Sequence, residues 1–183
     1  VIVDGTVEAS IPLPEVQGVV AAGPHTTFTQ AALAGLAAHG GTCVLCDEKH
    51  YPVGMLLPLQ THHIQVERFT AQARASHPTC KRVWQTIVKA KILSQHRCLE
   101  RLDRVDSRLP ALVKLVRSGD PANVEAQAAR RYWPQVFGDP QFRRDRHAGN
   151  QNRFLNYGYA VLRAMTARAI CAAGLHPGLG LHH

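Results

Sequence analysis

The stretch NRFLNYGYAVLRAMTARAICAAGLHPGLGLHH, residues 152–183, decides how the second half of this chain folds. Its first part has the apolar spacing of an α-helix, and Gly174 is the residue type that commonly ends one. A glycine- and proline-containing loop then leads to His182 and His183. Two terminal histidines are either the remainder of a purification tag or side chains that the loop delivers to a site. Gly158, early in the helix, predicts the close approach of another backbone.

The composition is that of an ordinary globular protein, with 45% apolar residues in a chain of 183. No apolar run reaches the roughly 18 residues of a membrane span, and no secretory pattern opens the chain. Five cysteines in that context favour free thiols in a reducing cytoplasm, which is the location we expect. Because Val1 already lies in a strand-like run, we expect a fragment that is incomplete at its start.

The net charge of +8 is unevenly distributed. Residues 1–58 contain one basic and five acidic residues, whereas residues 59–183 contain the other 20 basic residues and eight acidic ones. This asymmetry predicts two parts with different partners, and the basic part suits a polyanion such as nucleic acid. A basic surface that serves solubility alone is the alternative.

The pattern of short apolar runs and turns divides the chain after Pro58 into two predicted domains of an α+β protein. The first, residues 1–58, is small and β-rich with one helix that ends at Gly40-Gly41. The second, residues 59–183, is α-helical. Its expected helices are 62–75, 80–102, 109–117, a helix that starts at Asp120-Pro121 with the Asp side chain as its cap and runs through Trp133, and 152–173. Within 80–102 the predicted apolar stripe comprises Val83, Ile87, Val88 and Leu93.

Cys43 and Cys46 form the CxxC pair of the predicted strand 43–46. Residues i and i+3 of a strand point to opposite faces, so two core residues are favoured over a metal or redox pair. Asp47 and His50 follow this strand, and a solvated turn is favoured there over a metal site.

Glu125 is the candidate catalytic residue, because its helix also carries Arg130 and Arg131. A carboxylate repels the phosphate backbone, so its presence on a basic helix is expected where a divalent cation bridges protein and phosphate. The alternative is a surface glutamate paired with an arginine. Arg143 and Arg144, in the loop that follows, are further candidates for phosphate contacts.

Three segments resemble one known family, the CRISPR-associated integrase/endonuclease (Cas-one), the catalytic subunit of spacer acquisition. LNYGYAVLRAMTARAICAAGLHPGLGLHH is similar to its C-terminal signature, and VEAQAARRYWPQVFG resembles its catalytic-glutamate helix. CDEKHYPVGMLLPL resembles the end of its strand-rich N-terminal domain, particularly in type II systems. The resemblance extends from about residue 40 to residue 183.

The resemblance implies a fold, a set of partners and a metal site. It implies a β-rich domain before an α-helical catalytic domain, and a homodimer formed partly through the β-rich domains. Two such dimers flank a dimer of a small partner protein (Cas-two). It also implies magnesium or manganese held by Glu125, by His183 of the Gly-x-x-His pattern that starts at Gly180, and by a later acidic residue. The sequence stops before that third ligand, so we expect a chain that is truncated at its C-terminus.

The implied reaction is a DNA strand transfer, in which a 3′-hydroxyl attacks a phosphodiester of the CRISPR repeat. The ions that suit carboxylate and imidazole ligands include manganese and magnesium. A catalytically inactive DNA-binding or assembly module is the alternative that the incomplete ligand set leaves open. An unrelated helical nucleic-acid binder is the third, and it requires Glu125 and His183 to lie far apart.

Overall fold

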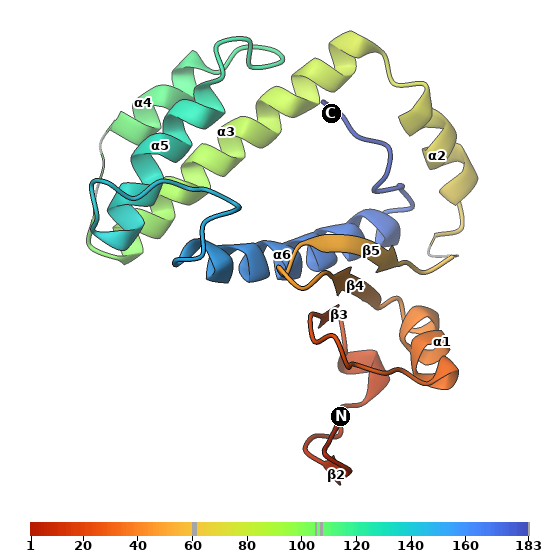
Figure 1. The fold of residues 1–183 in the computed structure, drawn as a ribbon. Helices are drawn as coiled ribbons and strands as arrows, with labels where there is room; N and C mark the ends of the chain where they lie inside the picture. Colours follow the sequence, from red (N-terminus) through yellow and green to blue (C-terminus); the bar gives the residue numbers. More distant parts are fainter. Residues whose placement is uncertain (60–61, 105, 107, 183) are drawn as a thin grey trace. The chain divides into compact units, whose positions relative to one another are not determined.

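The computed structural model describes residues 1–59, 62–104, 106 and 108–182 of the chain. These form two compact units (Figure 1). The first unit contains Val1–Ala73 and Arg146–Gly178, and the second contains Arg74–Asp145 and the segment that begins at Leu179. Among these described residues the strands lie in the first 56 positions and long helices follow, so the predicted mixture of α and β structure is confirmed. The division after Pro58 into independent domains stays a prediction.

The first unit contains a three-stranded sheet in the order β3-β4-β5. β3 (Gly18–Ala21) pairs in parallel with β4 (Thr42–Cys46), and α1 (Gln30–Ala38) connects them. The Thr29 side chain caps α1 by accepting a hydrogen bond from the Ala32 N–H at 3.2 Å. β5 (Pro52–Leu56) returns antiparallel to β4. β4 contains the predicted strand 43–46 and begins one residue earlier, at Thr42.

The turn between β4 and β5 is built on Asp47. Its Oδ1 accepts hydrogen bonds from the backbone N–H groups of Lys49 (2.9 Å) and Tyr51 (2.8 Å). This is the local turn-forming chemistry of an aspartate. The predicted solvated turn is therefore present, and its carboxylate is used by the backbone.

A short hairpin precedes the sheet. β1 (Ile2–Val3) pairs with β2 (Thr6–Val7) through the turn Asp4-Gly5, in which both residues have positive φ. A turn with two positive φ values matches the twist of a two-stranded hairpin. A 3-10 turn, η1 (Leu13–Glu15), lies between this hairpin and β3.

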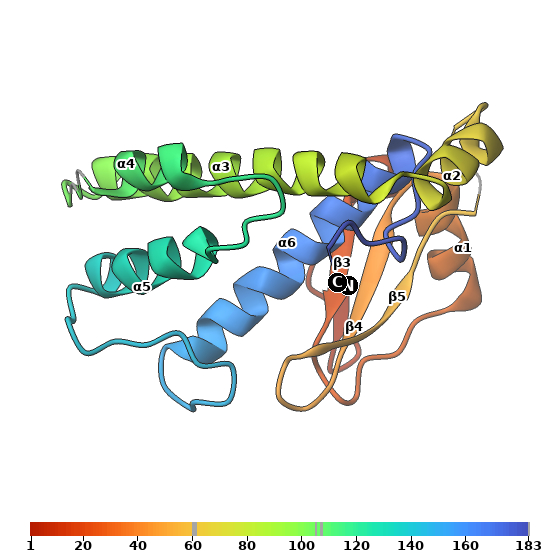
Figure 2. The same cartoon turned by 90° about the horizontal axis from the view of Figure 1, so that it is seen from above.

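Helix α6 (Asn152–Ala172) packs on the sheet through a face of small residues (Figure 2). Ala160, Ala164 and Ala167 are buried, and the Thr42 hydroxyl donates a hydrogen bond to the Ala164 carbonyl at 3.1 Å. The helix ends before Gly174, which has φ +68° as predicted for a C-terminal stop. The prediction for Gly158 is wrong, because no residue of the described part of this unit lies within 4 Å of the place its Cβ would take.

Two helices follow the sheet in sequence. α2 (Gln65–Ala73) belongs to the first unit, and α3 (His77–Arg101) begins the second. The Ser76 hydroxyl accepts the Thr79 N–H at 3.4 Å, and Pro78 lies in the first turn of α3. We expected α3 to begin at residue 80. Proline is tolerated in a first turn because its missing N–H would have no helical partner there.

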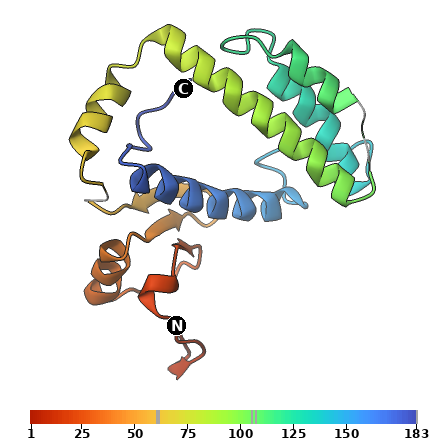
Figure 3. The same ribbon diagram turned by 180° about the vertical axis from the view of Figure 1, so that it is seen from behind.

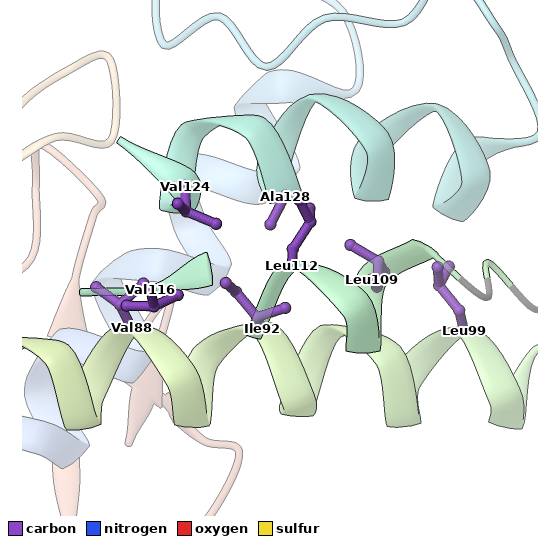
Figure 4. Packing of buried hydrophobic residues seen from close by; sticks show 8 residues of the cluster. All are labelled: Val88, Ile92, Leu99, Leu109, Leu112, Val116, Val124 and Ala128. Atoms are coloured by element: carbon purple, nitrogen blue, oxygen red, sulfur yellow. The ribbon is translucent and has the colours of Figure 1, made fainter. Parts of the chain in front are cut away.

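The second unit packs α3 against α4 (Arg108–Leu115) and α5 (Val124–Phe137) (Figure 3). Its core is drawn in Figure 4 and comprises Val88, Ile92, Leu99, Leu109, Leu112, Val116, Val124 and Ala128. Each large aliphatic side chain buried in this way contributes about 1.5–3 kcal/mol.

The predicted apolar stripe of α3 is only partly correct. Val88 is buried, but Val83, Ile87 and Leu93 are 40%, 42% and 38% exposed. The buried face consists of Val88, Ile92, Gln95 and Leu99, at the 4-3-4 spacing of one helix face. Ile87 precedes Val88 and Leu93 follows Ile92 in the sequence, so their side chains point about 100° away from the buried face of α3.

No helix of the described residues is long and apolar enough to cross a membrane.

Candidate metal and nucleic-acid site

Glu125 is the second residue of α5, and the turn before the helix fixes its backbone. Asp120 accepts two hydrogen bonds, from the Val124 N–H to Oδ1 (2.9 Å) and from the Glu125 N–H to Oδ2 (3.0 Å). Asn123 accepts the Ala126 N–H at 3.3 Å. The predicted capping role of Asp120 is confirmed. The predicted helix start is wrong by three residues, because Pro121 lies in the turn and α5 begins at Val124.

The Glu125 carboxylate forms an ion pair with the Lys91 ammonium group of α3. The Glu125 side chain is 27% exposed and that of Lys91 is 42% exposed, so solvent reaches both charges. The alternative prediction for Glu125, a surface glutamate paired with an arginine, has the wrong partner, because the partner in the structure is Lys91. An exposed pair of this kind contributes between 0 and about 1 kcal/mol, so the carboxylate is available to a competing cation.

His182 lies against the same helix that supplies Lys91. Its ring packs on Trp84 of α3, with the ring centroids 4.6 Å apart and the planes tilted by 31°. Trp84 and Lys91 are seven residues apart, which places them two turns apart on one face of α3, about 10 Å along its axis. His182 and Glu125 therefore contact side chains of one α3 face. The predicted ligand His183 lies outside the described residues.

Four arginines were predicted to contact phosphate. Arg130 is exposed and Arg131 half-buried on α5. Arg143 is exposed in the loop after α5, where its guanidinium donates to the carbonyls of Pro140 (3.0 Å) and Phe142 (2.9 Å). Arg144 is half-buried. Residues 74–145 carry 15 lysines and arginines against seven aspartates and glutamates.

The donor set for a metal is incomplete in the described part of the chain. There, no group of three or more histidine, cysteine, aspartate or glutamate side chains could hold an ion. The Glu125 carboxylate is a hard oxygen donor that fits magnesium or manganese. With Lys91 as its partner, it does not form a metal site without further ligands.

The CxxC pair has the properties of structural thiols. Cys43 is fully buried in β4, and burial followed by the charge of Cys46 raises the pKa of its thiol. Burial and then the Asp47 carboxylate raise the pKa of the Cys46 thiol. None of the five cysteines is in a disulfide bond. A raised pKa disfavours the thiolate that metal binding or redox chemistry needs.

Contacts between α2 and the loop 173–178, within the first unit, were not indicated by the sequence. The Gln72 side chain donates to the His176 carbonyl (2.9 Å) and accepts the His176 N–H (2.8 Å). The Arg68 guanidinium donates to the Ala173 carbonyl. The partners are more than 100 residues apart in sequence, and no local pattern indicates such a pairing.

Comparison with known proteins identifies the family to which this chain is similar. The model of the family "CRISPR associated protein Cas1" matches residues 1–183. The CRISPR-associated endonuclease Cas1 of Neisseria meningitidis is 40% identical over 176 residues, which are 95% of this chain and 57% of that protein. The CRISPR-associated endonuclease Cas1 2 of Pyrobaculum aerophilum is 27% identical over 187 residues, with coverage of 94% and 63%. The chain thus spans roughly three fifths of the length of these relatives.

Among solved structures, a casposase bound to integration product is similar to this chain. The TM-score is 0.74 at 21% sequence identity, and the match covers 92% of this chain and 53% of the casposase. At this identity the likeness shows a shared fold. The match of the family over all 183 residues and the 40% identical relative confirm the resemblance inferred from the sequence. The chain belongs to the Cas1 family of CRISPR-associated proteins.

Proposed function

We propose that this chain supplies the glutamate ligand and part of the DNA surface of a metal-dependent DNA endonuclease and integrase of CRISPR adaptation. The observation that carries the proposal is Glu125, a solvent-reached carboxylate in the first turn of α5 within a basic unit. Family membership supports it, as do the names of a relative called an endonuclease and of a structural neighbour bound to integration product.

In the proposed reaction a free 3′-hydroxyl of new spacer DNA attacks a phosphodiester of the repeat. One P–O bond forms while the P–O bond to the old strand end breaks, and the departing oxygen takes up the proton that the attacking hydroxyl loses. Attack by water in the same geometry gives hydrolysis. A bound magnesium or manganese ion supplies polarisation of the phosphate and offsets charge on the entering and leaving oxygens.

The residues of this chain have separate roles in that reaction. Glu125 and His183 are the proposed metal ligands, together with the third, acidic ligand that the resemblance implies. Arg130, Arg131, Arg143 and Arg144 are the proposed phosphate contacts, which position DNA without selecting its sequence.

The proposed partners are DNA, a second copy of the chain and a dimer of Cas2. Self-association through residues 1–58 is supported by apolar side chains that the N-terminal segment exposes. This N-terminal apolar patch comprises Val1, Ile2, Val3, Val7 and Ile11. Exposed apolar side chains that gather on one short segment commonly mark an interface. A protein that inserts DNA into a bacterial or archaeal array works in the cytoplasm, which is the proposed location.

The test replaces the carboxylate and measures binding and turnover separately. Glu125→Gln in the full-length protein should lower manganese-dependent strand transfer at least about 100-fold, since it removes a metal ligand. DNA affinity, measured by fluorescence anisotropy in the absence of divalent metal, should change less than about twofold, because phosphate contacts come from arginine and lysine. Glu100→Gln is the matched control, since Glu100 is a half-exposed glutamate of α3 paired with His96. Wild-type turnover in Glu125→Gln would refute the proposal.

A catalytically inactive DNA-binding or assembly module is the second candidate. The observation that favours it is the incomplete donor set of the described residues. DNA binding by the wild-type full-length protein without any metal-dependent turnover would support the module and exclude the enzyme.

A further inference from the structure

A basic loop, residues 146–151, precedes α6 in the first unit and is fixed at its start through one backbone carbonyl. The Arg146 carbonyl accepts hydrogen bonds from the Tyr51 hydroxyl and from the Asn156 side-chain amide, the latter at 3.0 Å. The Tyr51 ring also contacts the His147 ring, with the centroids 5.9 Å apart and the planes tilted by 51°. Two donors on one carbonyl, which has two lone pairs, fix the direction of the peptide as well as its position.

Both donors are themselves held in place. Asn156 is 6% exposed and belongs to the buried face of α6. Tyr51 lies directly before β5, where its N–H donates to Asp47 Oδ1 (2.8 Å) and its carbonyl accepts the Asp47 N–H (2.9 Å). The start of the loop is therefore positioned by the β4–β5 turn on one side and by α6 on the other.

The segment that begins with this loop contains no acidic residue. Residues 146–178 include four arginines and two histidines but no aspartate or glutamate. Arg146 is exposed, and among the described residues no carboxylate forms an ion pair with its guanidinium. An exposed guanidinium on a segment without acidic residues suits a polyanion, and its planar set of N–H donors matches the oxygens of a phosphodiester.

The anchored carbonyl has a consequence for binding. An arginine on a mobile loop loses backbone freedom when it binds phosphate, and that loss weakens binding. Here two hydrogen bonds already restrict the backbone at Arg146, while the side chain remains open to solvent. The packing of α6 on the sheet uses Ala160, Ala164 and Ala167, farther along the helix, and does not depend on the Tyr51 hydroxyl.

We propose that Arg146 makes a DNA-phosphate contact in the first unit, and that Tyr51 is a positioning residue that holds the Arg146 backbone for this contact. The inference rests on the proposed function, in which DNA is a partner. It extends the DNA surface beyond the four arginines of the second unit and gives the β4–β5 turn a part in DNA binding. Tyr51 touches no DNA and acts through the Arg146 carbonyl.

The experiment measures duplex DNA binding by the full-length protein without divalent metal, by fluorescence anisotropy over a range of salt concentrations. Arg146→Gln removes the charge, and Tyr51→Phe removes the hydroxyl while it keeps the ring against His147. Tyr157→Phe is the control for loss of a hydroxyl, since Tyr157 is a 49% exposed tyrosine of α6. Arg163→Gln is the control for loss of charge, since Arg163 is exposed and lies about 17 Å along α6 from its first residue. Thermal unfolding by circular dichroism checks that every variant is folded.

We expect Arg146→Gln to weaken binding about fivefold at about 0.1 M salt. The steepness of log affinity against log salt should fall by about one, as for the loss of one phosphate contact. Tyr51→Phe should weaken binding about two- to threefold, and each control less than about 1.5-fold. In the Arg146→Gln background Tyr51→Phe should cause no further loss, because the contact that it positions is already absent. A merely structural role of Tyr51 would weaken binding equally in both backgrounds.

The outcomes separate this proposal from the proposed function. Unchanged binding by Arg146→Gln overturns the phosphate contact, and an equal loss in Arg163→Gln overturns it as well, because the effect is then one of overall charge. Wild-type binding by Tyr51→Phe, or a loss that persists in the Arg146→Gln background, overturns the positioning role. In each of these cases the wild-type protein binds DNA and the proposed function stands. A folded wild-type protein that binds no DNA overturns both proposals.

Discussion

Asp120 holds the turn that places Glu125, and Asp120→Ala should destabilise the second unit by about 3 kcal/mol. The Asp120 side chain is 9% exposed and accepts the N–H groups of Val124 and Glu125 at 2.9 and 3.0 Å. Loss of a helix cap costs about 0.5–2 kcal/mol, and an orphaned buried N–H about 1–3 kcal/mol. Asp120 also has φ +48°, a left-handed conformation that costs alanine about 1 kcal/mol more. Asp120→Asn keeps one acceptor and tolerates the conformation, so about 1 kcal/mol is expected.

Urea unfolding followed by tryptophan fluorescence measures this loss. Both tryptophans of the chain, Trp84 and Trp133, lie in the second unit, so the signal reports that unit alone. Asp139→Ala is the control, since Asp139 is exposed and accepts one N–H, from Gln141 at 2.8 Å. It should cost less than about 1 kcal/mol. Equal losses for Asp120→Ala and Asp139→Ala would show that the double cap is unimportant and refute the argument.

Three further predictions concern metal, DNA and self-association. Lys91→Met should lower the manganese dissociation constant up to about fivefold, because the ion no longer has to displace the Lys91–Glu125 ion pair, which contributes at most about 1 kcal/mol. Weaker manganese binding by calorimetry would contradict this. Replacing both Arg130 and Arg131 by alanine should weaken binding to all duplex sequences alike and reduce the steepness of log affinity against log salt by about two. An unchanged steepness in anisotropy titrations would argue against phosphate contacts by these two arginines. Val7→Lys, in the N-terminal apolar patch, should weaken the dimer at least about tenfold in sedimentation velocity, and an unaltered dimer would locate the interface elsewhere.

Local chemistry in the sequence predicted the features that depend on few neighbouring residues. The stop at Gly174 and the capping carboxylate of Asp120 follow from residue types with one dominant backbone role. The starts of α3 and α5 were harder to predict, because a proline before a helical pattern is compatible with a stop, a first turn or a preceding loop. Pro78 lies inside a first turn and Pro121 lies before one.

The buried face of α3 shows why an apolar pattern alone misplaces a core. Gln95 is buried in that face, while Val83 and Ile87 are largely exposed. A search for apolar residues at helical spacing leaves out a buried glutamine and includes exposed valine and isoleucine. Only the packing of α4 and α5 against α3 decides which of two adjacent stripes is the core.

In the candidate site, too, the sequence indicates a residue with a local signal but not its partners from distant parts of the chain. Glu125 could be found from sequence because a lone carboxylate among arginines contradicts simple phosphate binding. Its partner Lys91 lies 34 residues earlier and has no such signal. Gln72 could not be found at all, because its partners are main-chain atoms whose identity the sequence does not encode.

The ion pair of Lys91 and Glu125 has a consequence for the order of events in the proposed reaction. In the absence of a cation, the lysine neutralises the carboxylate, so the site carries little net charge and attracts phosphate weakly. A divalent ion held by Glu125 would supply two positive charges, and the Lys91 ammonium, whose side chain is 42% exposed, would then be available to a phosphodiester. Linkage requires the reverse effect of equal size, so DNA should strengthen metal binding as much as metal strengthens DNA binding.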